Sequence, residues 1–170
     1  MIKVNKNRVK KLTVAAVIAA LYAALTYLAA TFGIAYGPIQ FRFSEALTVL
    51  PVFSSAAIPG LTIGCLISNM ASFNPIDMVF GTAATLIAAI LTRAFRKHTL
   101  FKAPLLSLLP PVLMNALLVG LEISIFYLDG FTLGGFAISF LEVGLGQLLV
   151  CYGLGIPLYF SLNKHKNIFD

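Results

Sequence analysis

The chain has 170 residues, of which 59% are hydrophobic and only 11% are charged, and its mean hydropathy is +0.95. An average globular domain is about 45–50% apolar, and so few charges could not cover the surface of a water-soluble domain of this size. The net charge of +6 does not indicate nucleic-acid binding, because the basic residues form short runs without interleaved aromatic residues. The composition predicts an all-α integral membrane protein with a single domain over residues 1–170.

The charges are strongly segregated along the sequence. Eleven of the twelve Lys and Arg residues lie in three clusters, within residues 3–11, 93–102 and 164–166. Five of the six acids lie within or beside the apolar stretches, at Glu45, Asp77, Glu122, Asp129 and Glu142. Because Lys and Arg gather on the cytoplasmic side of membrane proteins, the three clusters are expected to share one face.

Apolar stretches and helix-breaking residues predict six helices. In chain order they cover residues 12–31, 44–53, 58–70, 77–93, 104–126 and 135–162. The first follows a basic run, as a signal peptide would, but its apolar stretch exceeds the roughly 7–15 residues of a signal peptide. It is therefore predicted to be an uncleaved helix. Glycines and a proline are expected to weaken or bend the last helix.

The region 42–70 decides the predicted topology. Pro51, Pro59 and Gly60 interrupt it, which favours two short helices over one long helix. Two crossings, or a re-entrant pair, place all three basic clusters on one side, whereas a single crossing would separate them. We therefore predict a six-transmembrane-helix bundle with residues 1–11 and 163–170 in the cytoplasm, and with the interior acids in the outer half.

The charged residues of the predicted spans are candidates for a binding site, because a charge in the bilayer costs about 2.5–3.5 kcal/mol on the insertion scale. Glu122 and Glu142 have no cation within their own helices. Arg42 and Glu45, three residues apart, either line the site or form an interfacial salt bridge. Asp77 either contacts a ligand or only stabilises the first turn of its helix.

Three amide side chains extend the set of candidates. Asn115 lies two turns before Glu122 on the same helix face, and it either contacts a ligand or bonds to another helix. Gln147 is about 140° around its helix from Glu142, so its place in the site stays open. Asn69 is either a contact or a satisfied helix-end amide. Several carboxylates beside one Arg predict a ligand that has adjacent N–H donors or a positive charge.

The first predicted helix carries two parallel ridges of alanine. They are Ala15, Ala19 and Ala23, and beside them Ala16, Ala20 and Ala24. Such ridges let helices approach closely, either within the bundle or at a docking surface for another protein.

The sequence contains no nucleotide-binding motif, no catalytic motif and no metal-binding cysteine pair. It therefore predicts neither an enzyme nor a protein that binds a metal or cofactor, and any ATP hydrolysis would be done by a partner.

Several short segments, spread in order over nearly the whole chain, carry a resemblance to a known family. They are QFRFSEAL at 40–47, IPG at 58–60 with Gly64 and Asn69, DMVFGT at 77–82, NAL at 115–117 with Gly120 and Glu122, and EVGLG at 142–146. The chain resembles the QueT family, the substrate-binding S components of energy-coupling factor (ECF) transporters that are assigned to queuosine precursors. The segment at 40–47 is the most specific of these.

The resemblance implies a six-helix protein of the cell membrane, surrounded by membrane lipid, that binds a vitamin-like solute from outside. It implies delivery, by toppling in the membrane, to a shared transmembrane coupling protein with two cytoplasmic ATPases. Small residues of the first helix would form the docking surface, which assigns this role to Ala15, Ala19 and Ala23.

The resemblance also implies a ligand of the 7-deazaguanine class. Glu122 and Glu142 would bind its donor groups, and Asn115, Gln147 or Arg42 would meet its acceptor atoms. Gln147 stands where the family commonly has Glu, so ligand preference is expected to depend on it. The alternatives are an S component for another small vitamin, an intramembrane enzyme, and a packing subunit without a ligand.

Overall fold

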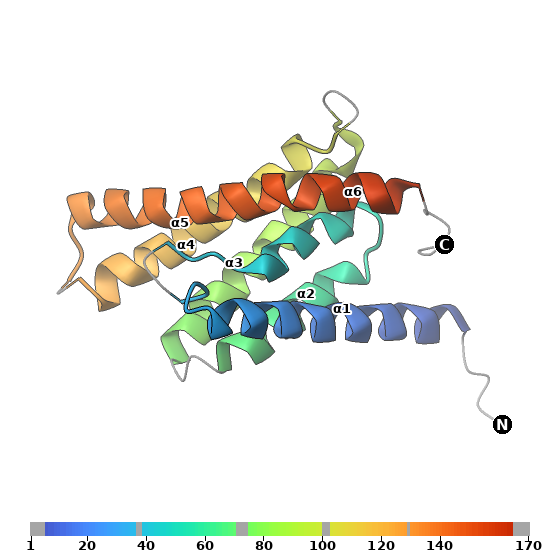
Figure 1. The fold of residues 1–170 in the computed structure, drawn as a ribbon, viewed down its shortest axis with the longest axis horizontal. Helices are drawn as coiled ribbons and strands as arrows, with labels where there is room; N and C mark the ends of the chain where they lie inside the picture. The colour runs from blue at the N-terminus through green and yellow to red at the C-terminus, as the bar shows by residue number, and fades with distance from the viewer. Residues whose placement is uncertain (1–5, 37–38, 71–74, 100–102, 129, 165–170) are drawn as a thin grey trace.

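The structure is a computed structural model that describes residues 6–36, 39–70, 75–99, 103–128 and 130–164. The described residues form a helical bundle (Figure 1). Its elements are α1 (Lys6–Thr31), the 3-10 helix η1 (Phe43–Val52), α2 (Ala57–Met70), α3 (Pro75–Ala94), the short 3-10 helices η2 (Phe95–Lys97) and η3 (Leu106–Leu108), α4 (Leu109–Phe126), α5 (Leu133–Gly153) and α6 (Gly155–Asn163). The predicted helical class and the order of the helices are confirmed.

Three predicted helices differ from the structure by more than one or two terminal residues. The predicted helix 104–126 begins as the 3-10 helix η3 at Leu106 and becomes α-helical at Leu109. Helix α1 begins at Lys6 rather than at residue 12, because Lys and Arg favour helical backbone and let the basic run continue the helix. The predicted helix 135–162 is divided into α5 and α6, with a break at Leu154.

Among the described residues, four helical segments are long and apolar enough to cross a membrane, and they are Lys6–Thr31, Pro75–Lys97, Leu106–Phe126 and Leu133–Asn163. Their outward faces carry large exposed hydrophobic residues, such as Leu21 and Leu28 on α1 and Leu141 and Leu145 on α5. Such faces are costly in water but are the expected surface of a helix in lipid.

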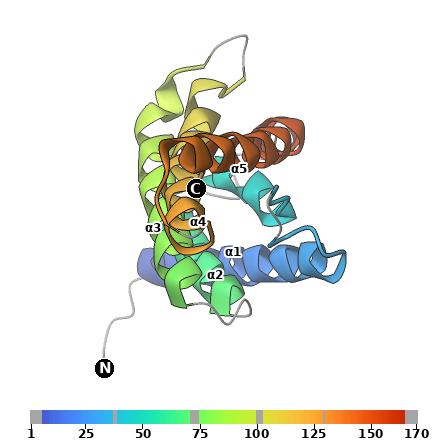
Figure 2. The same cartoon turned by 90° about the vertical axis from the view of Figure 1, so that its left-hand side faces the viewer.

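The 3-10 helix η1 lies inside the bundle. It contacts α1, α2, α3, α5 and α6, and all of its residues from Ser44 to Pro51 are buried. Figure 2, a view along the bundle, shows η1 (cyan) between α1 and α5. The sequence placed this helix correctly but did not predict its 3-10 geometry, which is rarely longer than three or four residues. Its ten residues and the 14 of α2 each rise only about 20 Å.

Helices α1 and α2 pack closely through small residues. A Cβ atom added at Gly60 would lie 2.8 Å from the carbonyl oxygen of Ala15, and one added at Gly64 would lie 2.8 Å from that of Ala19. Ala15, Ala19 and Ala23 are all buried. Helix α2 covers this ridge within the chain, which argues against the predicted docking role of Ala15, Ala19 and Ala23.

The neighbouring ridge of α1 is open. Ala16, Ala20 and Ala24 are exposed along the helix. Of the two alanine ridges, this is the one that another protein could reach without displacing α2.

Two observations agree with an even number of passes. The first described residues of α1 and the last of α6 lie at the same end of the bundle (Figure 1). Lys10 and Lys11 line one cavity together with Arg93, so the first two basic clusters also share that end. Six complete spans and a cytoplasmic location of the termini stay predictions.

The topology can be tested by labelling single cysteines in intact cells. Arg8→Cys and His98→Cys should be protected from an impermeant maleimide, and Phe131→Cys should react, because only position 131 is predicted outside. The native Cys65 and Cys151 are buried and free, so the background should be low. Labelling of position 98 from outside would overturn the topology.

Candidate functional site

Arg42 organises a buried polar cluster. Its side chain is 4% exposed, Nε donates to the carbonyl oxygen of Ala35 at 3.1 Å, and Nη1 donates to Oδ1 of Asn69 at 3.0 Å. Nη2 lies 3.7 Å from Oδ1 of Asp77, and the guanidinium carbon lies 5.1 Å from the ring centre of Tyr36, a cation–π contact. One cation thus joins the loop after α1, the end of α2 and the start of α3.

Arg42 remains charged at this position. Burial opposes its charge, but the carboxylate of Asp77 favours it, and the guanidinium group of Arg is not deprotonated in proteins. Within the described part of the chain, the recorded ion pair joins Arg42 to Asp77 and not to Glu45. The alternative of an Arg42–Glu45 salt bridge is therefore wrong, and Asp77 does more than stabilise a helix turn.

Asn69 belongs to the same cluster, although sequence reasoning had left its role open. Its Nδ2 donates to the backbone carbonyl of Asp77 at 3.1 Å. A Cβ atom added at Gly81 would lie 2.6 Å from that Nδ2, so the glycine on α3 makes room for the amide. Asn69 therefore fixes α2 against α3 while it orients Arg42.

Glu45 forms the second part of the site, on η1. It is 1% exposed, and its Oε1 accepts a hydrogen bond from the hydroxyl of Tyr22 on α1. Its Oε2 has no hydrogen-bond partner. Sequence reasoning missed Tyr22, because a single tyrosine in an apolar helix looks the same whether it packs, faces lipid or binds an acid.

Gln147 and Glu142 lie on different sides of α5, as the angle of about 140° between them predicts. Gln147 is buried beside the Glu45 carboxyl, and its Oε1 accepts a weak bond from the thiol of Cys151 at 3.6 Å. Glu142 is half-buried and has no recorded hydrogen bond or ion pair within residues 130–164 or the other described segments. Gln147 is thus placed with Glu45 rather than with Glu142.

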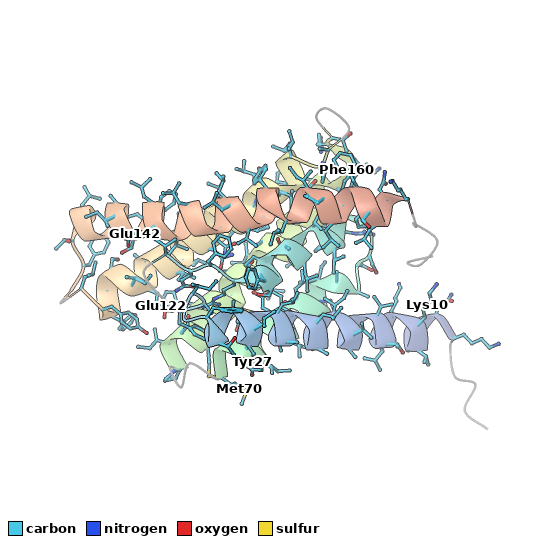
Figure 3. All side chains as sticks on the ribbon, in the orientation of Figure 1. Lys10, Tyr27, Met70, Glu122, Glu142 and Phe160 are labelled. Carbon is cyan, nitrogen blue, oxygen red and sulfur yellow. The ribbon has the colours of Figure 1, made fainter. Side chains whose placement is uncertain are left out.

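Glu122 is the third buried acid. It is 1% exposed, its Oε2 has no hydrogen-bond partner, and it interacts electrostatically with Asp77 and Arg42. Helix α4 approaches α5 closely, since a Cβ atom at Gly120 would lie 3.1 Å from the backbone of Phe140. Figure 3 shows the labelled Glu122 and Glu142 in the same half of the bundle, away from Lys10.

Asn115 is buried two turns before Glu122 on α4. Its Nδ2 donates to the carbonyl oxygen of Pro111 at 2.9 Å, within the same helix. The amide hydrogen bond that the structure records is therefore internal to α4 and does not reach another helix.

The cluster has an excess of acceptors. Among the described residues, Arg42 is the one buried cation, and it interacts electrostatically with the buried acids Glu45, Asp77 and Glu122. Three of their buried polar atoms lack a hydrogen-bond partner: Arg42 Nη2, Glu45 Oε2 and Glu122 Oε2. Buried polar groups are nearly always hydrogen-bonded, so this arrangement suits a ligand that offers several N–H donors and one acceptor. No group of three or more His, Cys, Asp and Glu suited to a metal ion occurs among the described residues.

The fold and these residues define a multi-pass helical membrane protein with a buried, charged cluster. The chain belongs to the QueT transporter family, whose sequence profile matches residues 12–164. A family of transporters agrees with the prediction that the chain is not an enzyme.

One curated relative supports this assignment. The chain is 41% identical over 83 residues to the protein named "Queuosine precursor transporter QueT" of Lactococcus lactis subsp. cremoris (strain MG1363), and the match covers 49% of each chain. The matched region thus spans about half the length of that relative. No solved structure matches this chain.

Proposed function

We propose that this protein is the substrate-binding S component of an ECF-type importer and that it captures a queuosine precursor of the 7-deazaguanine class. The proposal is supported by membership of the QueT transporter family and by the name of the Lactococcus lactis relative. The structural observation that carries it is the set of buried, unpartnered atoms on Arg42, Glu45 and Glu122.

The chemistry of a 7-deazaguanine complements this cluster. Its ring N1–H and exocyclic amine are adjacent donors, which one carboxylate can accept together, and charge-assisted bonds of this kind are roughly twice as strong as neutral ones. We assign this role to Glu122, because it is buried and its Oε2 is unpartnered. The O6 atom of the ring would accept from Nη2 of Arg42, with the amides of Asn115 and Gln147 as further partners.

A cationic aminomethyl group, present on some precursors, would bind a second carboxylate. Glu142 is assigned to this group because it is half-buried on α5, in the same half of the bundle as Glu122 (Figure 3). Glu45 and Asp77 are held by Tyr22 and Arg42, so their part is to keep the site in shape and negatively charged.

Transport would depend on partner proteins. The sequence contains no nucleotide-binding motif, so a transmembrane coupling protein and two cytoplasmic ATPases would supply the energy. The open ridge Ala16, Ala20 and Ala24 on α1 is the surface that we assign to the coupling protein, because small exposed residues allow close helix approach.

Ligand binding by paired variants tests the site. Glu122→Gln and Glu142→Gln make the same change, from acid to amide, at a buried and a half-buried position. Glu122→Gln should weaken binding of every guanine-like ring about ten- to hundredfold, the equivalent of about 1.5–3 kcal/mol for a charge-assisted bond. Glu142→Gln should weaken only aminomethyl forms. Calorimetry with a series of 7-deazaguanines, including an analogue without the exocyclic amine, measures both effects.

Three outcomes would contradict parts of the proposal. If both variants bind every ligand as tightly as the parent protein, the ligand lies elsewhere. If mass spectrometry of the purified protein finds a retained vitamin that is not a deazapurine, the chain is an S component for another solute. If uptake in cells does not require a coupling protein and ATPases, the ECF proposal fails.

A further inference from the structure

A second charged region lies at the opposite end of the bundle from Glu122 and Glu142, where Figure 3 labels Lys10. It is a cavity of about 400 Å³ between the start of α1, the link from η1 to α2, and the end of α3. The residues that line it are Asn7, Lys10, Lys11, Val14, Phe53, Ser54, Ser55 and Arg93.

The cavity is positively charged. Lys10, Lys11 and Arg93 line it, and no acid does. Among the described residues, none of these three cations forms an ion pair. Arg93 is held in place because its Nη1 donates to the carbonyl oxygens of Pro51 at 2.9 Å and of Val52 at 3.2 Å.

Polar and apolar groups complete the cavity in an arrangement suited to an amphipathic ligand. The hydroxyl groups of Ser54 and Ser55 lie just before the start of α2 at Ala57, where the helix dipole adds positive potential. Val14 and Phe53 form an apolar wall. Phosphate oxygens would therefore meet ammonium, guanidinium and hydroxyl donors, and carbon chains would meet the apolar wall.

We propose that this cavity binds the phosphate headgroup of an anionic phospholipid at the membrane surface. A basic pocket between helices is the expected form of such a site. Val17, three residues after Val14 on α1, is exposed beside the cavity, and an acyl chain would lie on it. A bound lipid would hold the first turns of α1 against the end of α3, at the end of the bundle remote from the solute site.

Binding of lipid to purified protein tests the proposal. The variant Lys10→Gln/Lys11→Gln removes two charges from the cavity but leaves Arg93, which supports η1, unchanged. The control Arg96→Gln/Lys97→Gln removes two charges from exposed residues of η2 that do not line the cavity. In detergent, dioleoylphosphatidylglycerol should raise the unfolding temperature of the parent protein and of the control, whereas dioleoylphosphatidylcholine should not.

In the cavity variant, native mass spectrometry should show phosphatidylglycerol affinity reduced about fivefold for each lysine removed. Equal lipid affinity in the parent protein and both variants would overturn the proposal, because the contacts would then be non-specific. Glycerol 3-phosphate is the probe for a free phosphate ligand. If it binds as tightly as the lipid and competes with it, the site recognises a soluble phosphate and the lipid assignment fails.

Discussion

Replacing Arg42 by methionine is expected to destabilise the protein by about 3–5 kcal/mol, the cost of leaving a buried charge without its partner. The substitution nearly conserves volume, so the loss would come from the charge and the hydrogen bonds. Asp77 would lose its cation, and the Oδ1 of Asn69 and the carbonyl of Ala35 would lose their guanidinium donors. Titration of the purified protein in detergent with a denaturant measures the change in its free energy of unfolding.

The double variant Arg42→Met/Asp77→Asn separates charge from packing. Removing both charges leaves no unpaired ion in the bundle, so the double variant should recover part of the stability that Arg42→Met loses. The stability of Arg42→Lys should fall between those of the parent protein and Arg42→Met. Lysine keeps the charge but lacks the planar guanidinium group that donates to Ala35 and Asn69 together. A stable Arg42→Met variant that gains nothing from Asp77→Asn would show that the pair does not support the fold.

A tryptophan at position 20 is expected to abolish solute uptake while ligand binding persists. Ala20 is exposed on the open ridge of α1, so a bulky side chain there would block close approach of the coupling protein without displacing a packed helix of this chain. Uptake in cells that also contain the coupling protein and ATPases, together with calorimetry on the isolated variant, measures the two properties separately.

Two neighbouring positions provide controls for this prediction. Leu21→Trp is on an exposed, lipid-facing position outside the ridge, so uptake should be kept. Ala19→Trp should lower the stability of the fold, because Ala19 packs against Gly64 and overpacking commonly costs about 1–3 kcal/mol. Undiminished uptake by Ala20→Trp would remove the assignment of this ridge as the docking surface.

The sequence was enough to predict which charged residues belong to the buried cluster, but not which of them pair with one another. Glu45, Asp77, Glu122 and Arg42 stand out because charged residues are rare in apolar stretches, and the structure buries all four. That Arg42 pairs with Asp77, 35 positions along the chain, depends on how α2 and α3 place the two residues. The spacing of three residues had suggested Glu45 as the alternative partner of Arg42. Such spacing describes contacts within one helix and cannot predict a contact between helices.

The sequence by itself determined the class of protein and the order of its helices, because apolar length and breakers act locally. Only the tertiary structure decided which alanine ridge of α1 is covered, since both ridges are equally small and the positions of Gly60 and Gly64 against α1 make the choice. It also decided that η1 is a 3-10 helix buried among five α-helices. A buried segment can adopt this less favourable geometry because the surrounding helices, rather than its own propensity, fix its conformation.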